Sequence, residues 1–386
     1  MMLLFALLMA AFIAYRVVVP LKIGKVWKVC VLFLILIACC KHQLTRLFGG
    51  PRFFAPDLPP WFLLPAAWAY GVVFLLFFGL LAVEIVRAAA KFVSFCRTGP
   101  GAPEKLDPVF RKVCLALVPA AAVLALFGLW RGTVLPGVKE VELAFPDLPP
   151  SAENCRIVVL ADLHADRVTR SEKIRRIVEQ ANKLTPDLTL VLGDLVDGPV
   201  EQRGPELLPL RELRARLGVY AVPGNHEYYS GYAPWMKFFS GLGMQRLENA
   251  HVRLPNGIFL AGITDPAARS FGEAMPDLGK ALHGIPRGAF VLLLAHRPGP
   301  AWQAAGSGVS LQLSGHTHGG MIRGIDWIVA QFNGTFVSGL YEVDGMKLYV
   351  SNGTSIWNGF PIRLGRESEI TLITLRREGS AAARSE

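Results

Sequence analysis

The sequence carries little charge for its length. Only 18% of its 386 residues are Asp, Glu, Lys or Arg, against about a quarter in typical soluble proteins. Hydrophobic residues make up 52%, which excludes an intrinsically disordered, collagen-like or purely coiled-coil chain. The composition also argues against a protein that is soluble throughout. The length allows two or three domains.

Cysteine is scarce beyond the first third of the chain. Of the six cysteines only Cys155 follows residue 137, so the last two-thirds of the chain cannot form an internal disulfide. No two cysteines have the spacing Cys-x-x-Cys, which excludes a zinc ribbon and a thioredoxin-like motif.

Acidic residues are almost absent from residues 1–137, which hold 4 Asp and Glu against 14 Lys and Arg. Residues 138–386 hold 26 of each sign, so the whole net charge of +10 lies in the most apolar third. A nucleic-acid-binding protein would carry its charge on the domain that contacts the nucleic acid, so we expect no such partner. Basic residues between apolar stretches instead indicate loops that flank membrane helices.

Four apolar stretches predict a membrane region over residues 1–137. They lie at 1–15 (continued at 17–20), 29–40, 61–83 and 113–130. A spanning helix needs about 20 apolar residues, so the third and fourth are strong candidates, whereas the second needs its flanking lysines to reach the headgroups. The first lacks a basic start and a clear cleavage site, so we interpret it as a retained helix and not a signal peptide. We expect about four spans.

The basic residues also predict an orientation. The segments that follow the first and third apolar stretches are the most basic, and the positive-inside rule places both in the cytoplasm. Four crossings then place the next domain, residues 138–376, on the other side. We therefore predict an integral protein of the inner or plasma membrane whose larger domain is extracytoplasmic.

Residues 138–376 alternate short strands with helical patterns, which predicts an α/β fold. The expected strands are 141–143, 156–161, 187–192, 218–222, 289–295, 309–314, 347–350 and 370–375, with helices at 171–183 and 206–217. The polar tail, residues 377–386, is expected to be disordered.

Residues suited to metal binding follow five of these strands directly. Open α/β sheets place their sites at the carboxyl ends of strands, and five of the eight histidines fall there. The residues at these strand ends are Asp162, His164, Asp194, Asn225, His226, His296, His316 and His318.

Imidazole and carboxylate ligands suit divalent ions such as Mn²⁺, Zn²⁺, Fe²⁺ or Mg²⁺. The donors are too many for one open site, and they fit two ions that share a carboxylate, an arrangement that acts on phosphate esters. Asp162 and His164 are two residues apart, as are His316 and His318. In an extended strand end this spacing puts both side chains on one side.

The order of these blocks resembles the calcineurin-like metallophosphoesterase superfamily, and most of all its membrane-anchored bacterial branch. The blocks are Asp162-Leu-His164, Gly193-Asp-Leu-Val-Asp197, Gly224-Asn-His-Glu227, His296 and Gly315-His-Thr-His318. The resemblance covers residues 156–318 and implies a two-sheet α/β sandwich flanked by helices. Gly198 departs from the pattern, because many relatives carry Arg or Asn there to contact phosphate.

The resemblance also implies the role of each residue. The ligands of one ion would be Asp162, His164 and His318. Those of the second would be Asn225, His296 and His316, with Asp194 bridging the two. His226 would protonate the leaving-group oxygen, and Asp197 would orient His226 or a ligand.

The membrane stretches favour a membrane or lipid-linked phosphate as substrate, so we expect hydrolysis of a phosphodiester or pyrophosphate bond. One alternative is cleavage of the pyrophosphate of a UDP-diacylglucosamine precursor of lipid A, an activity of resembling members. That activity requires a cytoplasmic site and conflicts with the predicted orientation. Aromatic clusters at 228–239 and 327–336 either line an opening for acyl chains or pack in the core.

A different class of function is a membrane transporter or sensor whose metallophosphoesterase-like domain is regulatory. Transport pathways usually contain ionisable residues within the spans, and only Glu84 lies near one here. A binding domain would also not need a complete set of ligands together with His226. Both observations favour an enzyme.

Overall fold

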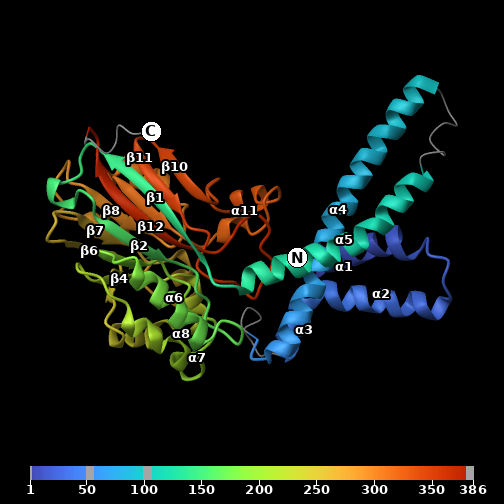
Figure 1. Ribbon diagram of the computed structural model, residues 1–386, viewed down its shortest axis with the longest axis horizontal. Coiled ribbons are helices and arrows are strands. Elements are labelled where there is room, and N and C mark those ends of the chain that lie inside the picture. The colour runs from blue at the N-terminus through green and yellow to red at the C-terminus, as the bar shows by residue number, and fades with distance from the viewer. Residues whose placement is uncertain (1, 49–55, 99–106, 380–386) are drawn as a thin grey trace. The chain divides into compact units, whose positions relative to one another are not determined.

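The computed structural model describes residues 2–48, 56–98 and 107–379, and its chain divides into two units (Figure 1). One unit is helical and contains residues 1–130 with the short segment Asn358–Ile362. The other contains residues 131–357 and the chain from Arg363 onward. The predicted boundary at 137–138 lies a few residues beyond the end of the last long helix, at Thr133.

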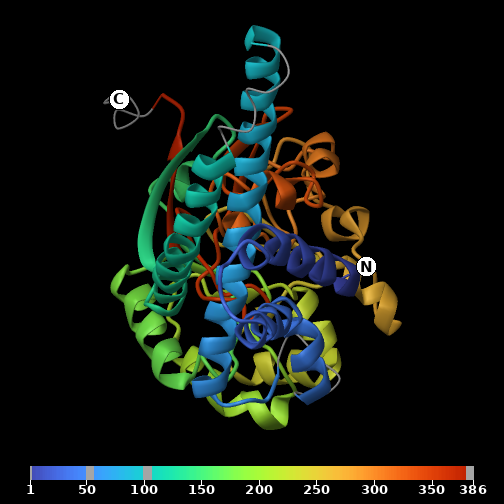
Figure 2. The ribbon, with the colours of Figure 1, turned by 90° about the vertical axis from the view of Figure 1, so that its right-hand side faces the viewer.

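The helical unit begins with α1 (Met2–Ile13), which continues as a π-helical turn over Ala14–Val18. It goes on with α2 (Lys25–Cys39), α3 (Lys41–Phe48), α4 (Pro60–Thr98) and α5 (Asp107–Thr133). Helices α1, α2 and α4 contact one another, as Figure 2 shows. Within this unit Phe360 packs edge-on against Phe74, with ring centroids 4.6 Å apart.

Two of the described helices, Pro60–Arg97 and Asp107–Thr133, are long and apolar enough to cross a membrane. Helices α2 and α3 meet at a bend of 72° and give a third crossing only if the pair counts as one span. The helix over Met2–Val18 is apolar but shorter than the 18 residues expected of a span. The expected four spans are therefore not confirmed, because α2 has 15 residues and at 1.5 Å per residue covers only about 22 Å.

The second unit is built on two sheets of six strands each. The first has the order β1 (Gly137–Phe145), β12 (Glu369–Arg377), β2 (Arg156–Leu160), β3 (Leu188–Val191), β4 (Val219–Ala221) and β5 (Gln245–Arg246). The second has the order β10 (Gly339–Val343), β11 (Met346–Val350), β9 (Leu311–Ser314), β8 (Val291–Leu294), β7 (Phe259–Gly262) and β6 (Ala250–Arg253). Strands β2 to β5 are parallel, and so are β7, β8, β9 and β11.

Both faces of the central strands are covered, which explains why β2, β3 and β8 are almost continuously apolar. Side chains from both sheets form one buried core, among them Val159, Leu190 and Leu292. Helices α6 (Ser171–Lys183), α7 (Val200–Leu207) and α8 (Asn225–Gly241) pack on the outer face of the first sheet. Helices α9 (Leu278–Leu282) and α10 (Ala301–Gly306) pack on the outer face of the second. The expected α/β fold of two sheets flanked by helices is confirmed.

The elements predicted from sequence differ from the structure in the place of one helix and in the absence of four strands. A helix was expected over residues 206–217, but α7 ends at Leu207 and a short 3-10 turn occupies Leu208–Glu212. Pro209 has no amide proton to continue an α-helix. The missed strands are β5, β6, β7 and β10, which have two to five residues each. Strand β12 extends to Arg377, and residues 380–386 of the expected disordered tail lie outside the described residues.

Candidate metal centre

The predicted site residues lie in loops that follow strands β2, β3, β4, β8 and β9. These strands end at Leu160, Val191, Ala221, Leu294 and Ser314. Because the strands run in parallel within their sheets, their carboxyl ends open on the same edge. The structure brings the predicted Asp and His ligands together there.

The backbone that carries the ligands is not extended, contrary to what the two-residue spacing suggested. Asp162 and His164 have φ angles of 53° and 47°, and His316 and His318 have 69° and 49°. Asp194 also lies in the left-handed region, with a φ of 53°. A left-handed residue other than glycine costs about 1–2 kcal/mol, and such strain persists where the surroundings determine it.

Hydrogen bonds between neighbouring loops hold these strained turns. The amide of Asp162 donates to the carbonyl of Gly193 (3.1 Å), and that of His164 donates to the carbonyl of Asp194 (3.0 Å). The amide of His316 donates to the Asp162 carboxylate, at 3.0 Å from each oxygen. The ligand positions are therefore fixed by one another's loops and not by strand periodicity.

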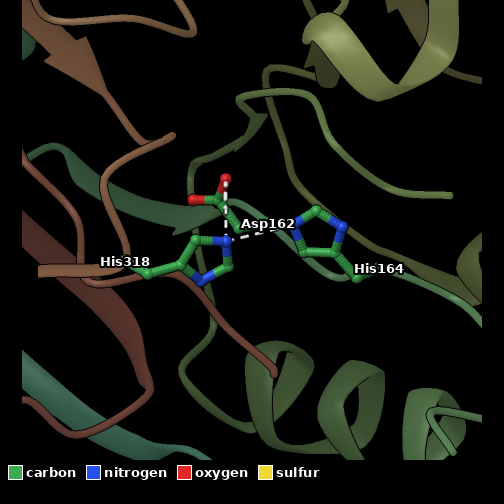
Figure 3. Close-up of side chains that lie close together, drawn as sticks. All are labelled: Asp162, His164 and His318. Atoms are coloured by element: carbon green, nitrogen blue, oxygen red, sulfur yellow. Dashed lines mark hydrogen bonds and ion pairs between the residues drawn. The ribbon is translucent and has the colours of Figure 1, made fainter. Parts of the chain in front are cut away.

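The first group of donors is Asp162, His164 and His318, all buried (Figure 3). The Nε2 atoms of His164 and His318 lie 3.1 Å apart, and His318 Nε2 lies 3.9 Å from Asp162 Oδ1. Two ring nitrogens and a carboxylate that face one point are suited to hold a cation between them.

The second group is Asp194, His296 and His316. His296 Nε2 lies 3.2 Å from Asp194 Oδ2 and 3.2 Å from His316 Nδ1. His296 Nδ1 faces the backbone carbonyl of Leu192 at 2.7 Å. That contact fixes Nδ1 as the donor and leaves Nε2 as the ligand atom.

Asp194 stands between the two groups, and its two oxygens have different surroundings. Oδ1 accepts a hydrogen bond from the amide of His226 (2.8 Å). Oδ2 lies 3.2 Å from His296 Nε2, and 3.9 Å from the Nε2 atoms of both His164 and His226. One oxygen atom therefore faces both groups of donors, which is the geometry a bridging carboxylate requires.

Asn225 completes the donor set from the first position of α8. Its side chain is only 4% exposed, and its carbonyl oxygen has no hydrogen-bond partner among the described residues. A buried amide oxygen without a partner is costly, and a cation would satisfy it. The residues therefore fit a two-ion centre with nitrogen and oxygen ligands.

The histidines of the site differ in the direction in which their surroundings shift the pKa. Burial lowers the pKa of His316 and His318, and neighbouring cationic groups keep both well below the ordinary value, so both rings are neutral. Burial also lowers the pKa of His296, but Asp194 and Asp162 outweigh it and raise that pKa to about 10. Burial raises the pKa of Asp194, yet His296, His226 and His164 bring it well below its usual range.

His226 lies beside the donors with its Nδ1 bonded to Asp197 Oδ1. Asp197 is buried, and its other oxygen lies 3.3 Å from His164 Nδ1. Burial raises the pKa of Asp197, but His226 and His164 lower it to about 2. Burial lowers the pKa of His226, but Asp194 and Asp197 raise it to about 9. Asp197 thus holds the His226 ring in one orientation and favours its protonated form.

Several known proteins are similar in sequence to this chain. The profile of the calcineurin-like phosphoesterase family matches residues 155–320, which contain every predicted ligand. A Danio rerio protein named "Transmembrane protein with metallophosphoesterase domain" is 35% identical over 84% of this chain and 76% of that protein. The chain belongs to the calcineurin-like phosphoesterase family.

Other relatives of this metallophosphoesterase come from animals and bacteria alike. A Bos taurus protein with the same name as the Danio rerio one is 38% identical, and the match covers 68% of this chain and 63% of that protein. An uncharacterized metallophosphoesterase of Helicobacter pylori is 36% identical over 72% of this chain and 76% of its own. The resemblance is therefore not confined to a bacterial branch.

The metallophosphoesterase site also depends on Glu227, which the sequence showed only as the last letter of a motif. Glu227 is fully buried. Its Oε2 accepts from the amides of Asp194 (3.0 Å) and Gly224 (2.7 Å), and its Oε1 accepts from the amide of Leu195 (2.7 Å). Glu227 thereby joins the loop that carries Asp194 to the start of α8. Its place three residues after Gly224 was the signal available.

Arg363 was missed altogether. It is 2% exposed, and its Nη2 donates to Ser355 O (2.6 Å) and lies 3.0 Å from His318 Nδ1. It follows the matched family region by more than forty residues, so no local pattern linked it to His318. Arg363 thus lies directly against the His318 ring.

Aromatic side chains border His226 and His318. The ring centroids of Tyr229 and His226 lie 5.3 Å apart. The ring centroid of Trp357 lies 6.1 Å from that of His226 and 6.4 Å from that of His318. Most of the first predicted aromatic cluster instead packs in the core, including Tyr228 and Trp235. In the second cluster Trp327 and Phe332 are exposed.

Proposed function

We propose that this chain is a dinuclear-metal-dependent phosphoester hydrolase. The observation that carries the proposal is the position of Asp194 Oδ2, which faces ring nitrogens of His164, His226 and His296 within 3.9 Å. Ion pairing alone would not need three histidines around one carboxylate oxygen. Two cations held beside this carboxylate would account for His164 and His296 as ligands, with His226 as a neighbouring proton donor.

One ion would be held by Asp162, His164 and His318. The other would be held by Asn225, His296 and His316, with Asp194 shared. Bound divalent cations supply two things, a water of lowered pKa and compensation of charge on the phosphoryl oxygens. The donors are nitrogen and oxygen only, which suits Mn²⁺, Zn²⁺, Fe²⁺ or Mg²⁺.

His226 is the proposed general acid. A water oxygen attacks phosphorus and releases one proton to solvent, the bond from phosphorus to the leaving oxygen breaks, and the proton of His226 Nε2 passes to that oxygen. Asp197 keeps His226 Nδ1 protonated and so points Nε2 into the site. A group that must give a proton at neutral pH benefits from a raised pKa, and Asp197, which binds His226 Nδ1, raises the pKa of His226.

The proposed substrate is a phosphodiester or pyrophosphate of a membrane or lipid-linked compound, with the membrane itself as a partner. Two apolar helices long enough to cross a membrane lie in the same chain, and two relatives are named transmembrane proteins. Tyr229 and Trp357 border the acid and would contact the leaving group. No nucleic-acid partner is proposed.

The proposed orientation places the metallophosphoesterase domain outside the cytoplasm. The segment ahead of α5 is rich in Lys and Arg, so the positive-inside rule assigns it to the cytoplasm. A crossing by α5 then puts Thr133 and the following domain on the opposite side. A reporter fused after residue 386 that is active only in the cytoplasm tests this assignment.

The experiment is hydrolysis by the detergent-purified full chain, stripped of metal and supplied with Mn²⁺ or Zn²⁺. The panel holds a chromogenic monoester, a chromogenic diester, phospholipids and a UDP-linked diacyl sugar. We expect metal-dependent turnover that Asn225→Ala abolishes. Two bound ions without turnover of any substrate would contradict the hydrolase and favour a regulatory domain.

The role of His226 has its own test. His226→Ala should reduce turnover by about 10²–10⁴-fold, the range for general acid–base groups, with two ions still bound. A variant that loses both ions would show instead that His226 supports the metal centre and not the proton transfer.

A further inference from the structure

The helical unit contains a polar cavity of about 240 Å³ where α4 and α5 meet the chain that follows α1. The charged residues that line it are Arg16, Glu84, Arg87, Asp107 and Arg111. A water molecule occupies about 30 Å³ in the liquid, so the cavity has room for a group much larger than a single water. None of these residues belongs to the metal centre.

The charges around the cavity do not balance. Glu84 pairs with Arg16 and with Arg87 (3.3 Å). Asp107 pairs with Arg87 (2.7 Å) and with Lys91 (2.8 Å). Three lining arginines, Arg16, Arg87 and Arg111, therefore face two lining carboxylates, and Lys91 beside Asp107 adds a further cation among the described residues.

Two of the arginines have guanidinium N–H donors that are not engaged by described residues. Arg16 Nε is buried and has no hydrogen-bond partner among the described residues. Arg111 is exposed, and the bond found for its guanidinium goes to the backbone carbonyl of Pro20. A guanidinium has five N–H donors in a fixed fork that matches phosphate oxygens. The cavity therefore offers donors and positive charge together.

The cavity lies where apolar runs of the sequence give way to charged residues. The apolar run of α4 ends at Val83, directly before Glu84, and that of α5 begins at Val113, directly after Arg111 and Lys112. Arg16 follows the apolar residues of α1 and stands in the π-helical turn Ala14–Val18. Such turns frequently occur at functional sites. Three apolar segments thus change to charged residues around one cavity.

We propose that this cavity binds the phosphate group of an anionic phospholipid. The phosphate would compensate the excess of positive charge and accept from Arg16 and Arg111, while the acyl chains lie against the apolar parts of α4 and α5. Basic pockets between transmembrane helices are known to bind anionic headgroups. The lipid would brace the end of the helical unit and is distinct from the substrate of the metal centre.

The test is native mass spectrometry of the full chain in detergent, titrated with phosphatidylglycerol, phosphatidylcholine, glycerol phosphate or inorganic phosphate. We expect retention of phosphatidylglycerol in preference to phosphatidylcholine. Removal of one basic residue near a membrane surface weakens binding by about fivefold. Arg16→Gln and Arg111→Gln should each show that loss, and Arg46→Gln, an exposed basic residue of α3, should show none.

Arg111→Gln should not disturb folding, because Arg111 is exposed and pairs with no described carboxylate. A loss of lipid binding in this variant therefore cannot be attributed to misfolding. Equal retention by wild type and both cavity variants would overturn the proposal. Equal retention of phosphatidylcholine would also overturn it, since binding would then not depend on headgroup charge. Tight binding of free phosphate with no preference for the lipid would show an anion site without a lipid, which overturns the assignment of a phospholipid.

Discussion

Replacing Gly224 by alanine adds a single methyl group, and we expect it to disrupt the candidate metal centre. Its φ and ψ angles of −99° and −172° are open to any residue, so Gly224→Ala introduces no backbone strain. The added methyl carbon would nevertheless lie 2.2 Å from Asp194 Oδ1 and 2.6 Å from the amide nitrogen of Asp194. The perturbation is purely steric, and its target is the shared carboxylate.

The size of the effect follows from these contacts. Ordinary contact of a methyl carbon begins near 3.4 Å, so Asp194 Oδ1 must move by about 1.2 Å. That shift breaks the 2.8 Å bond from the His226 amide and turns Oδ2 away from His296. Overpacking costs about 1–3 kcal/mol, and a lost bond to a carboxylate about 1.5–3 kcal/mol. The expected loss is therefore about 3–6 kcal/mol, together with both ions.

The assay combines thermal unfolding of the metal-free chain with metal content after equilibration with Mn²⁺. For a domain of this size about 1 kcal/mol shifts Tm by 2–4 °C, so Gly224→Ala should lower Tm by roughly 6–24 °C. Gly241→Ala, at the other end of α8, is the matched control, because nothing lies within 4 Å of the added methyl. Two tightly bound ions in Gly224→Ala, with a Tm equal to the control, would refute the packing argument.

Substitutions at three further positions test other parts of the structure. Asp194→Asn should lose both ions together, because one oxygen faces both groups, and metal analysis that finds one ion tightly retained would contradict a shared ligand. Arg363→Gln should weaken the affinity of the ion at His318 by about 10–100-fold, as for other residues that orient metal ligands. Arg363→Lys should restore part of that loss, and an unchanged metal titration in Arg363→Gln would show that Arg363 does not position the ring. Lys173→Met concerns pH, because burial and the nearby Arg363 lower the pKa of Lys173 from 10.5 to about 8. Between these two pH values the unfolded chain holds a proton that the folded chain has released, so the contribution of Lys173 to stability rises with pH across this window. The variant should lose that rise, and Tm–pH curves that run parallel for variant and wild type would contradict the assignment.

The ligands could be found from sequence because each follows a buried strand at once. A strand such as Arg156–Leu160 is apolar on both faces, so the polar residue that ends the run stands out. The parallel order of the strands then brings residues as distant as Asp162 and His318 to one edge. Local patterns and one rule of sheet topology were enough for this step.

The supporting residues could not be found in this way, because nothing local ties them to the site. Arg363 reaches His318 across 45 residues, and its neighbours in sequence form no strand or helix. Ser355 and Lys173 meet across 182 residues. Contacts of this kind depend on how the loops after β11 return over the sheet edge, which hydrophobic periodicity does not encode.

The left-handed residues show that the spacing argument assumed a backbone conformation that the chain does not have. An extended chain would have placed Asp162 and His164 on one side at no conformational cost. The structure uses strained turns instead, with φ angles of 53° and 47°. In each turn the backbone amide donates a hydrogen bond to the loop that carries Asp194. A strained loop that relies on its neighbour moves with it, so the five loops behave as one body. Disturbing Asp194 should therefore displace His164 as well as the direct contacts of Asp194, which is why we expect Gly224→Ala to remove both ions and not only one.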